Sequence, residues 1–180
     1  MVTKAYINPD KELIERYNKT IQFVDNQHLN PNCRILDLGE KNPLTKILED
    51  KGFSVYNTGK TDLDLDPLEA KNYDVEIVTA FEILEHLVSP FPLLKNLPGN
   101  KLIATVPLSL WFKSAYKNSK DSWDCHYHEF EDWQFDWLLE KSGWKIINKE
   151  KWNSPGTKIG IRPLLRRFTP RYYAVYAERQ

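Results

Sequence analysis

The segment Cys33-Arg34-Ile35-Leu36-Asp37-Leu38-Gly39 decides how the rest of the chain is interpreted. It is a short apolar run that ends in an acidic residue and a glycine, which is typical of a buried strand followed by a tight turn. Similar apolar runs predict further strands over residues 53–58, 75–80, 102–106, 144–147 and 172–177. Helical spacing of apolar residues predicts helices over residues 9–27, 43–51, 81–88 and 131–141. Strands that alternate with helices indicate an α/β fold with an open, doubly wound and mostly parallel sheet.

Length and composition exclude several classes of protein. The 180 residues suit a single domain over 1–180, with a core at 33–150 and a basic connection and final strand at 151–180. The 25 basic residues balance the 25 acidic ones, so only a local patch would attract nucleic acid or a membrane surface. The sequence contains no apolar run of membrane-spanning length and no apolar leader near residue 1. Cys33 and Cys125 lie too far apart in the sequence for a metal knuckle, so we expect a reduced, cytoplasmic protein.

Ligands of an open α/β sheet bind beyond the carboxyl ends of its strands. The polar segments at those ends are therefore the candidates for function. They are Asp37-Leu38-Gly39-Glu40, Asn57-Thr58, Phe81-Glu82 and Val106-Pro107.

Four segments resemble class I S-adenosylmethionine-dependent methyltransferases, in the order in which that family has them. They are Ile35 to Gly39, Tyr73 to Leu87, Leu102 to Pro107, and His126 to Phe130 followed by Leu138 to Trp144. The resemblance implies a Rossmann-like sheet with a reversed final hairpin, shortened between its second and fourth strands. It also implies S-adenosylmethionine as methyl donor, with donor contacts from Asp37, Gly39, Glu40, Asn57, Asp64 and Phe81.

The sequence departs from the family pattern at two places. The family continues its first motif as Gly-x-Gly-x-Gly, whereas here Gly39 is followed by Glu40, Lys41, Asn42 and Pro43. The acidic residue expected after the second strand is replaced by Asn57. For the acidic loop at 62–66 two interpretations stay open: Asp64 holds the adenine amino group, or Asp62, Asp64 and Asp66 are solvated loop acids.

Glu82-Ile83-Leu84-Glu85-His86 is the sharpest local signal. On the predicted helix these positions share one face, so two carboxylates and an imidazole converge. Such a group suits Mg²⁺ or Mn²⁺. The pattern resembles two methyltransferase groups that use a divalent ion, the ubiquinone-biosynthesis O-methyltransferases and the small-RNA 3′-terminal 2′-O-methyltransferases.

The resemblance implies a metal on Glu82, Glu85 and His86, completed by a later histidine, His128 or His126. The catalytic residues would be Glu82, Glu85, His86 and His126. Two interpretations without a metal remain: His86 packs or caps a turn, and the later histidines are structural.

Between Lys151 and Arg171 the sequence contains six basic residues and no acidic one. RNA or another anionic substrate would suit this stretch. Alternatively it is a solvated loop that closes over the core through Leu164, Leu165 and Phe168. An aromatic segment at 110–123 is expected to form a loop or a lid.

These observations favour a methyltransferase that acts on a hydroxyl or similar nucleophile of an unidentified substrate, either a small molecule or an anion such as RNA. The missing glycines favour the alternative, a catalytically inactive methyltransferase-like domain that binds a partner or acts as a scaffold.

Overall fold

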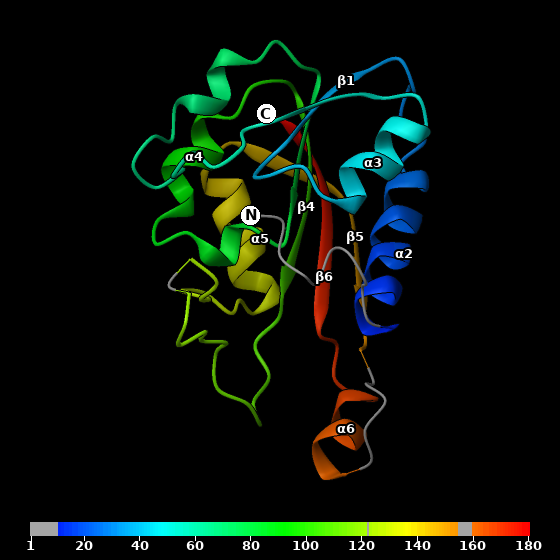
Figure 1. The fold of residues 1–180 in the computed structure, drawn as a ribbon, viewed down its shortest axis with the longest axis vertical. Coiled ribbons are helices and arrows are strands. Elements are labelled where there is room, and N and C mark those ends of the chain that lie inside the picture. The colour runs from blue at the N-terminus through cyan, green and yellow to red at the C-terminus, as the bar shows by residue number, and fades with distance from the viewer. Residues whose placement is uncertain (1–10, 122, 155–159) are drawn as a thin grey trace.

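The computed structural model describes residues 11–121, 123–154 and 160–180 (Figure 1). Its strands are β1 Arg34–Asp37, β2 Ser54–Asn57, β3 Ile77–Phe81, β4 Lys101–Pro107, β5 Trp144–Trp152 and β6 Tyr172–Arg179. Its α-helices are α2 Lys11–Asp25, α3 Pro43–Asp50, α4 Pro90–Asn96, α5 Asp132–Lys141 and α6 Ile161–Arg166, and its short 3₁₀ helices are η1 Glu69–Asn72 and η2 Leu84–His86. The predicted first helix is present as α2, although residues 9 and 10 lie outside the described part.

The six strands form one sheet in the order β2-β1-β3-β4-β6-β5. The first four strands are parallel, and β6 runs antiparallel to both β4 and β5. The predicted mostly parallel sheet with a reversed final hairpin is therefore confirmed. The stretch between β2 and β3 carries only loops and η1 in place of a further strand, as its short length predicted.

Helices cover both faces of the sheet, with α2 and α3 on one side and α4 and α5 on the other (Figure 1). Alternate residues of each strand therefore face two different cores. On β1, Ile35 packs with residues of α2 and α3, whereas Leu36 packs with the core under α4 and α5. Burial on both faces explains why the strands are almost continuously apolar in the sequence.

The turn between β1 and α3 is built from the residues that replace the expected glycines. The side-chain oxygen of Asn42 accepts hydrogen bonds from the backbone N–H groups of Leu44 and Thr45, and the Thr45 hydroxyl accepts one from the Asn42 N–H. Pro43 occupies the first helical position, where its missing N–H costs nothing. This capping box stabilises the start of α3 by about 1 kcal/mol.

The predicted helix over 81–88 is wrong. β3 continues to Phe81, and Glu82 then adopts a left-handed conformation with φ of 54° while its N–H donates to the Thr105 carbonyl of β4. Only the 3₁₀ turn η2 follows, and α4 begins at Pro90. A right-handed helix cannot run through a residue with positive φ, so none can start at 81 and pass Glu82.

The long connection between the last two strands starts at the same sheet edge as the carboxyl ends of the parallel strands. Trp152 at the end of β5 and Pro107 at the end of β4 both pair with Tyr172. The connection contains α6, which lies beyond the end of β6 (Figure 1). Leu164 and Phe168 are exposed, so the expectation that they close over the core is wrong for these two residues.

No helix in the described part of the chain is long and apolar enough to cross a membrane. Cys33 and Cys125 are free thiols, in agreement with the absence of a predicted disulfide framework.

Candidate active site

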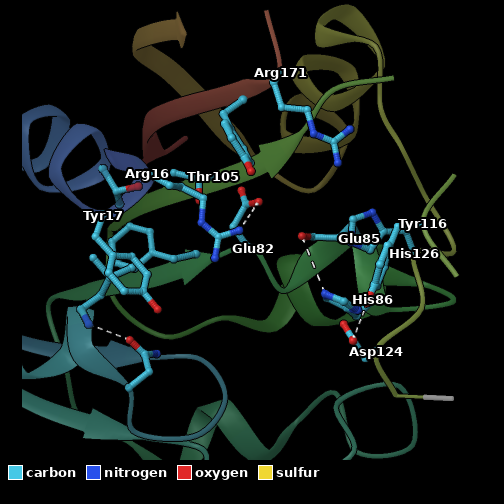
Figure 2. A pocket seen from close by; sticks show the side chains of 15 residues that line it. Arg16, Tyr17, Glu82, Glu85, His86, Thr105, Tyr116, Asp124, His126 and Arg171 are labelled. Atoms are coloured by element: carbon cyan, nitrogen blue, oxygen red, sulfur yellow. Dashed lines mark hydrogen bonds and ion pairs between the residues drawn. The ribbon is translucent and has the colours of Figure 1, made fainter. Parts of the chain in front are cut away.

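A cavity of about 310 Å³ lies beyond the carboxyl ends of β3 and β4. Its walls come from α2, the start of α3, the β3–η2 turn, the loop before α5 and the start of β6. Figure 2 shows that most of the labelled side chains carry charged or ionisable groups, among them Arg16, Glu82, Glu85, His86 and Arg171. The cavity therefore lies where an open α/β sheet binds its ligands.

Two buried carboxylates form the floor of the cavity. The Glu82 side chain is 12% exposed and the Glu85 side chain 1%. Burial raises the pKa of both groups, and the negative charge of Glu82 raises the pKa of Glu85 further. Oε1 of Glu82 and Oε2 of Glu85 are buried without a hydrogen-bond partner among the described residues. Buried acceptors without donors are costly, so this pair is suited to receive a proton or a cation.

Arg16 brings a positive charge from α2 to this pair. Its Nη1 lies 3.3 Å from Oε2 of Glu82, and its guanidinium lies over the rings of Tyr17 and Tyr172. Burial alone would lower the pKa of Arg16, but Glu82 and Tyr172 raise it above its usual value. Arg16 therefore stays charged and ties α2 to the end of β3.

Glu82 also holds a strained backbone conformation. A positive φ costs a residue with a side chain about 1–2 kcal/mol. The hydrogen bond to Thr105 and the ion pair with Arg16 keep it in place. Strain of this kind is concentrated at functional sites.

His86 is oriented by the loop that precedes α5. Its Nδ1 lies 3.1 Å from the Cys125 carbonyl oxygen, and since a carbonyl only accepts, Nδ1 carries the proton. Nε2 then keeps its lone pair, 3.8 Å from Oε1 of Glu85. Burial and the neighbouring His126 lower the pKa of His86, so the ring is neutral at neutral pH.

His126 reaches the same place because its loop is pinned to η2. The Glu85 carbonyl accepts hydrogen bonds from the N–H groups of Tyr127 and His128. The ring of His126 stands edge-on to His86, with centroids 4.9 Å apart, and its Nδ1 lies 3.4 Å from Oε1 of Glu129. Burial would raise the pKa of Glu129, but His126 and Arg171 hold it below its usual value, so Glu129 is ionised.

The two later histidines lie differently with respect to Glu85 and His86. Glu85, His86 and His126 each offer one ligand atom within 4.8 Å of the others. His128 instead directs Nε2 to the Val88 carbonyl, at 3.2 Å. Glu82 lines the same cavity but is outside this three-residue group.

The residues expected to contact a donor have varied roles. Asp37 is buried and accepts hydrogen bonds from the hydroxyls of Thr45 and Thr79 at 2.7 and 2.8 Å. Burial raises the pKa of Asp37 to about 6, although these donors partly oppose the shift. Gly39 donates its N–H to the Thr58 hydroxyl, and a Cβ on it would lie 3.1 Å from Ile83.

Two of the residues expected to contact the donor already form hydrogen bonds within the protein. The Asn57 amide donates to the backbone and side chain of Asp37. The Asp64 carboxylate accepts the N–H groups of Val88 and Ser89 at 2.8 and 2.9 Å. The Asp64 carboxylate is thus bound to the backbone of the segment before α4 rather than only solvated.

The remaining residues expected to contact the donor, and those that replace the glycines, differ in whether they line the cavity. Glu40 is exposed and pairs loosely with Lys60, whereas Phe81 lines the cavity. Lys41 points away to Glu49, and neither it nor Pro43 lines the cavity, which leaves Asn42 and Leu44 as its wall on this side.

Sequence reasoning missed Arg16 and Arg171, which both line the cavity. Arg16 lies on a predicted amphipathic helix and belongs to no motif, so nothing in the sequence singled it out. Only the fold brings it to Glu82, 66 positions away in the sequence.

No protein-family model and no curated protein sequence matches the chain. Among solved structures, the chain is similar to 1,6-didemethyltoxoflavin-N1-methyltransferase from Burkholderia thailandensis, which was crystallised with 1,6-didemethyltoxoflavin and S-adenosylhomocysteine bound. The TM-score is 0.65 and the sequence identity 15%, and the match covers 98% of this chain and 84% of that one. An S-adenosylmethionine-dependent methyltransferase from Archaeoglobus fulgidus is similar with a TM-score of 0.60 and 16% identity, and the match covers 91% of this chain and 94% of that one. The [4+2]-cyclase SpnF is similar with a TM-score of 0.60 and 13% identity, and the match covers 91% of this chain and 81% of that one. The chain therefore has the Rossmann-like fold of class I methyltransferases, a fold that also occurs in a cyclase.

The raised pKa of Asp37 predicts a pH dependence of stability. Because its pKa is about 6 in the folded state and near 3.8 unfolded, folding favours the protonated acid. The contribution is full below about pH 4 and is lost as the pH rises through about 6. Relative to Asp37→Asn, the wild type should lose up to about 3 kcal/mol of unfolding free energy across that interval. Urea unfolding at several pH values measures the difference, and parallel curves for the two proteins would contradict it.

Proposed function

We propose that the chain is an S-adenosylmethionine-dependent methyltransferase that acts on a hydroxyl or similar nucleophile bound in this cavity. The observation that carries the proposal is the pair of carboxylates, Glu82 and Glu85, each with a buried unpaired oxygen, at the carboxyl edge of the sheet, where Glu85 lies beside two histidines. The class I methyltransferase fold supports it.

The cavity fits the amino-acid end of the methyl donor. That end carries a carboxylate, an ammonium and a sulfonium group. Arg16 would hold the carboxylate, and the unpaired oxygens of Glu82 and Glu85 would face the cationic groups. When bound, the donor supplies an electrophilic methyl group. Gly39 and Phe81 are the nearest of the expected residues for the nucleoside, since Asn57 and Asp64 already have partners.

His126 is the best-placed general base. Glu129 is ionised and lies next to Nδ1, which favours the tautomer with the proton on Nδ1 and the lone pair on Nε2. Nε2 would take the proton of the acceptor hydroxyl, and Glu129 would stabilise the imidazolium that forms. In this mechanism Glu129 is a positioning residue and His126 a catalytic one.

A metal-assisted variant rests on the same residues. Glu85, His86 and His126 form a group of one carboxylate and two imidazoles. The hydrogen bond from Nδ1 of His86 to the Cys125 carbonyl fixes that ring, and Nδ1 of His126 lies 3.4 Å from Oε1 of Glu129. Two nitrogen ligands favour Mn²⁺ over Mg²⁺. A bound ion would lower the pKa of an acceptor hydroxyl.

A binding or scaffold role without methyl transfer is the second candidate. The glycine-poor turn favours it, and so do the hydrogen bonds that Asn57 and Asp64 already make within the protein in place of two expected donor contacts.

For the substrate, Arg171 at the cavity wall favours an anionic group. RNA bound along residues 151–171 remains one candidate for that anion.

Donor binding separates these candidates. Titration calorimetry should show S-adenosylmethionine binding more tightly than S-adenosylhomocysteine, because only the former carries a sulfonium charge opposite the buried acids. Arg16→Gln should weaken S-adenosylmethionine binding about ten-fold or more. It should leave 5′-methylthioadenosine, which has no carboxylate, unaffected.

Lys41→Gln is the matched control, since Lys41 lies in the same turn but points away from the cavity. An absence of heat with millimolar S-adenosylmethionine would leave only the scaffold role.

Metal binding is tested separately by the electron paramagnetic resonance of Mn²⁺. Glu85→Gln and His126→Gln should each weaken Mn²⁺ binding by at least about ten-fold. His128→Gln should leave it unchanged, because His128 is engaged with Val88. If all three variants bind like the wild type, the metal hypothesis fails while methyl transfer with His126 as base stands.

A further inference from the structure

The segment from Gly160 to Phe168, here called the α6 tip, exposes apolar side chains that nothing in the described structure covers. Ile161 is 79% exposed, Leu164 54% and Phe168 77%. Solvated loops carry scattered apolar residues, but three such residues within eight positions are a concentrated apolar surface.

The α6 tip is also strongly basic. The sequence from Lys151 to Arg171 contains six Lys or Arg residues and no acid. Lys151 and Arg171 point back to Asp132 and Glu129, whereas Arg166 and Arg167 form no ion pair with any residue in the described ranges. Their charge is therefore available to an external partner.

A fourth exposed apolar side chain lies on the neighbouring loop. Trp111, 78% exposed, follows β4 by a few residues. That loop and the α6 connection leave the sheet side by side, since the Leu108 N–H donates to the Arg171 carbonyl at 2.8 Å. Figure 1 shows both segments extending past the carboxyl ends of β4 and β5, in the same direction.

We propose that the α6 tip and Trp111 dock on an anionic lipid bilayer. Ile161, Leu164 and Phe168 enter the interface, and Arg166 and Arg167 lie among the acidic headgroups. Basic residues interleaved with exposed apolar ones are the composition of interfacial elements. Tryptophan favours the same depth.

The same features disfavour RNA as the occupant. Single-stranded nucleic acid binds through basic grooves and stacked aromatic rings, and Ile161 and Leu164 offer neither a ring nor a hydrogen bond. A bilayer uses both the aliphatic and the cationic side chains. Docking would also bring the cavity toward the headgroups, because Arg171 lies both at the base of the connection and in the cavity wall. The docking itself does not depend on methyl transfer.

Cosedimentation of the full chain with vesicles tests the proposal. The wild type should bind vesicles of phosphatidylcholine mixed with phosphatidylglycerol and bind pure phosphatidylcholine weakly. The double variant Arg166→Gln with Arg167→Gln should lower the partition coefficient about 30-fold. Either substitution alone should lower the partition coefficient about ten-fold or less. The control pair Lys71→Gln and Lys145→Gln removes the same charge from exposed sites elsewhere and should have little effect.

The apolar contribution has its own readout. Ile161→Ser with Phe168→Ser should lower binding to mixed vesicles at least about ten-fold. Tryptophan fluorescence should shift to the blue on binding, and Trp111→Phe should remove most of that shift. Circular dichroism should show all variants folded, because these side chains are exposed.

Three outcomes would overturn the proposal. The first is wild-type protein that does not sediment with mixed vesicles. The second is binding that the arginine and apolar variants leave unchanged. The third is preferential binding of an RNA oligonucleotide, or a dimer that the apolar variants dissociate, in place of vesicle binding.

Discussion

The burial of two adjoining carboxylates at the end of β3 is the constraint on which the site depends. Glu82 and Glu85 are withdrawn from water, and a single ion pair with Arg16 compensates only part of their charge. An uncompensated buried charge is expensive, so the pair must share a proton or receive a cation. The ion pair also fixes α2 across the site, which makes the first helix a wall of the cavity rather than an addition to the fold. Docking of α2 and the protonation of the acids are thereby coupled.

The turn after β1 shows how a glycine-poor motif is accommodated. Asp37 is not directed at the cavity; it receives the hydroxyls of Thr45 and Thr79, and Thr45 completes the capping box with Asn42. The polar residues that replace the glycines therefore stabilise the start of α3. The backbone at Gly39 still approaches another segment closely, but that segment is Ile83 of the protein itself. The turn is compatible with the fold on structural grounds alone, whereas the proposed donor binding depends on Glu82 and Glu85.

The sheet was predictable because its strands are buried on both faces, which leaves continuous apolar runs such as the one ending at Asp37. The helix predicted over residues 81–88 is wrong because Leu84 and Leu87 keep the same spacing in a 3₁₀ turn, and the sequence does not reveal the left-handed conformation of Glu82. The choice between His126 and His128 could not be made from the sequence. Residues two positions apart in an irregular loop face different directions according to hydrogen bonds such as those on the Glu85 carbonyl.

The cavity and the α6 tip differ in charge, although both lie at the carboxyl edge of the sheet: the cavity sets Arg16 and Arg171 beside two acids, whereas the tip is basic. The cavity holds two acids with unpaired oxygens, while Arg166 and Arg167 on the tip have no acidic partner within residues 11–121, 123–154 and 160–180. A net charge of zero for the whole chain hides this separation. Long-range attraction to an anionic surface would act on the tip first, because its charges are exposed and those of the cavity are buried. A cationic group would then be selected only inside, where the low dielectric strengthens its interaction with Glu82 and Glu85. The two sets of charges would therefore act one after the other. The arginines of the α6 tip would attract the protein to an anionic surface, and Glu82 and Glu85 would then select a cationic group inside the cavity.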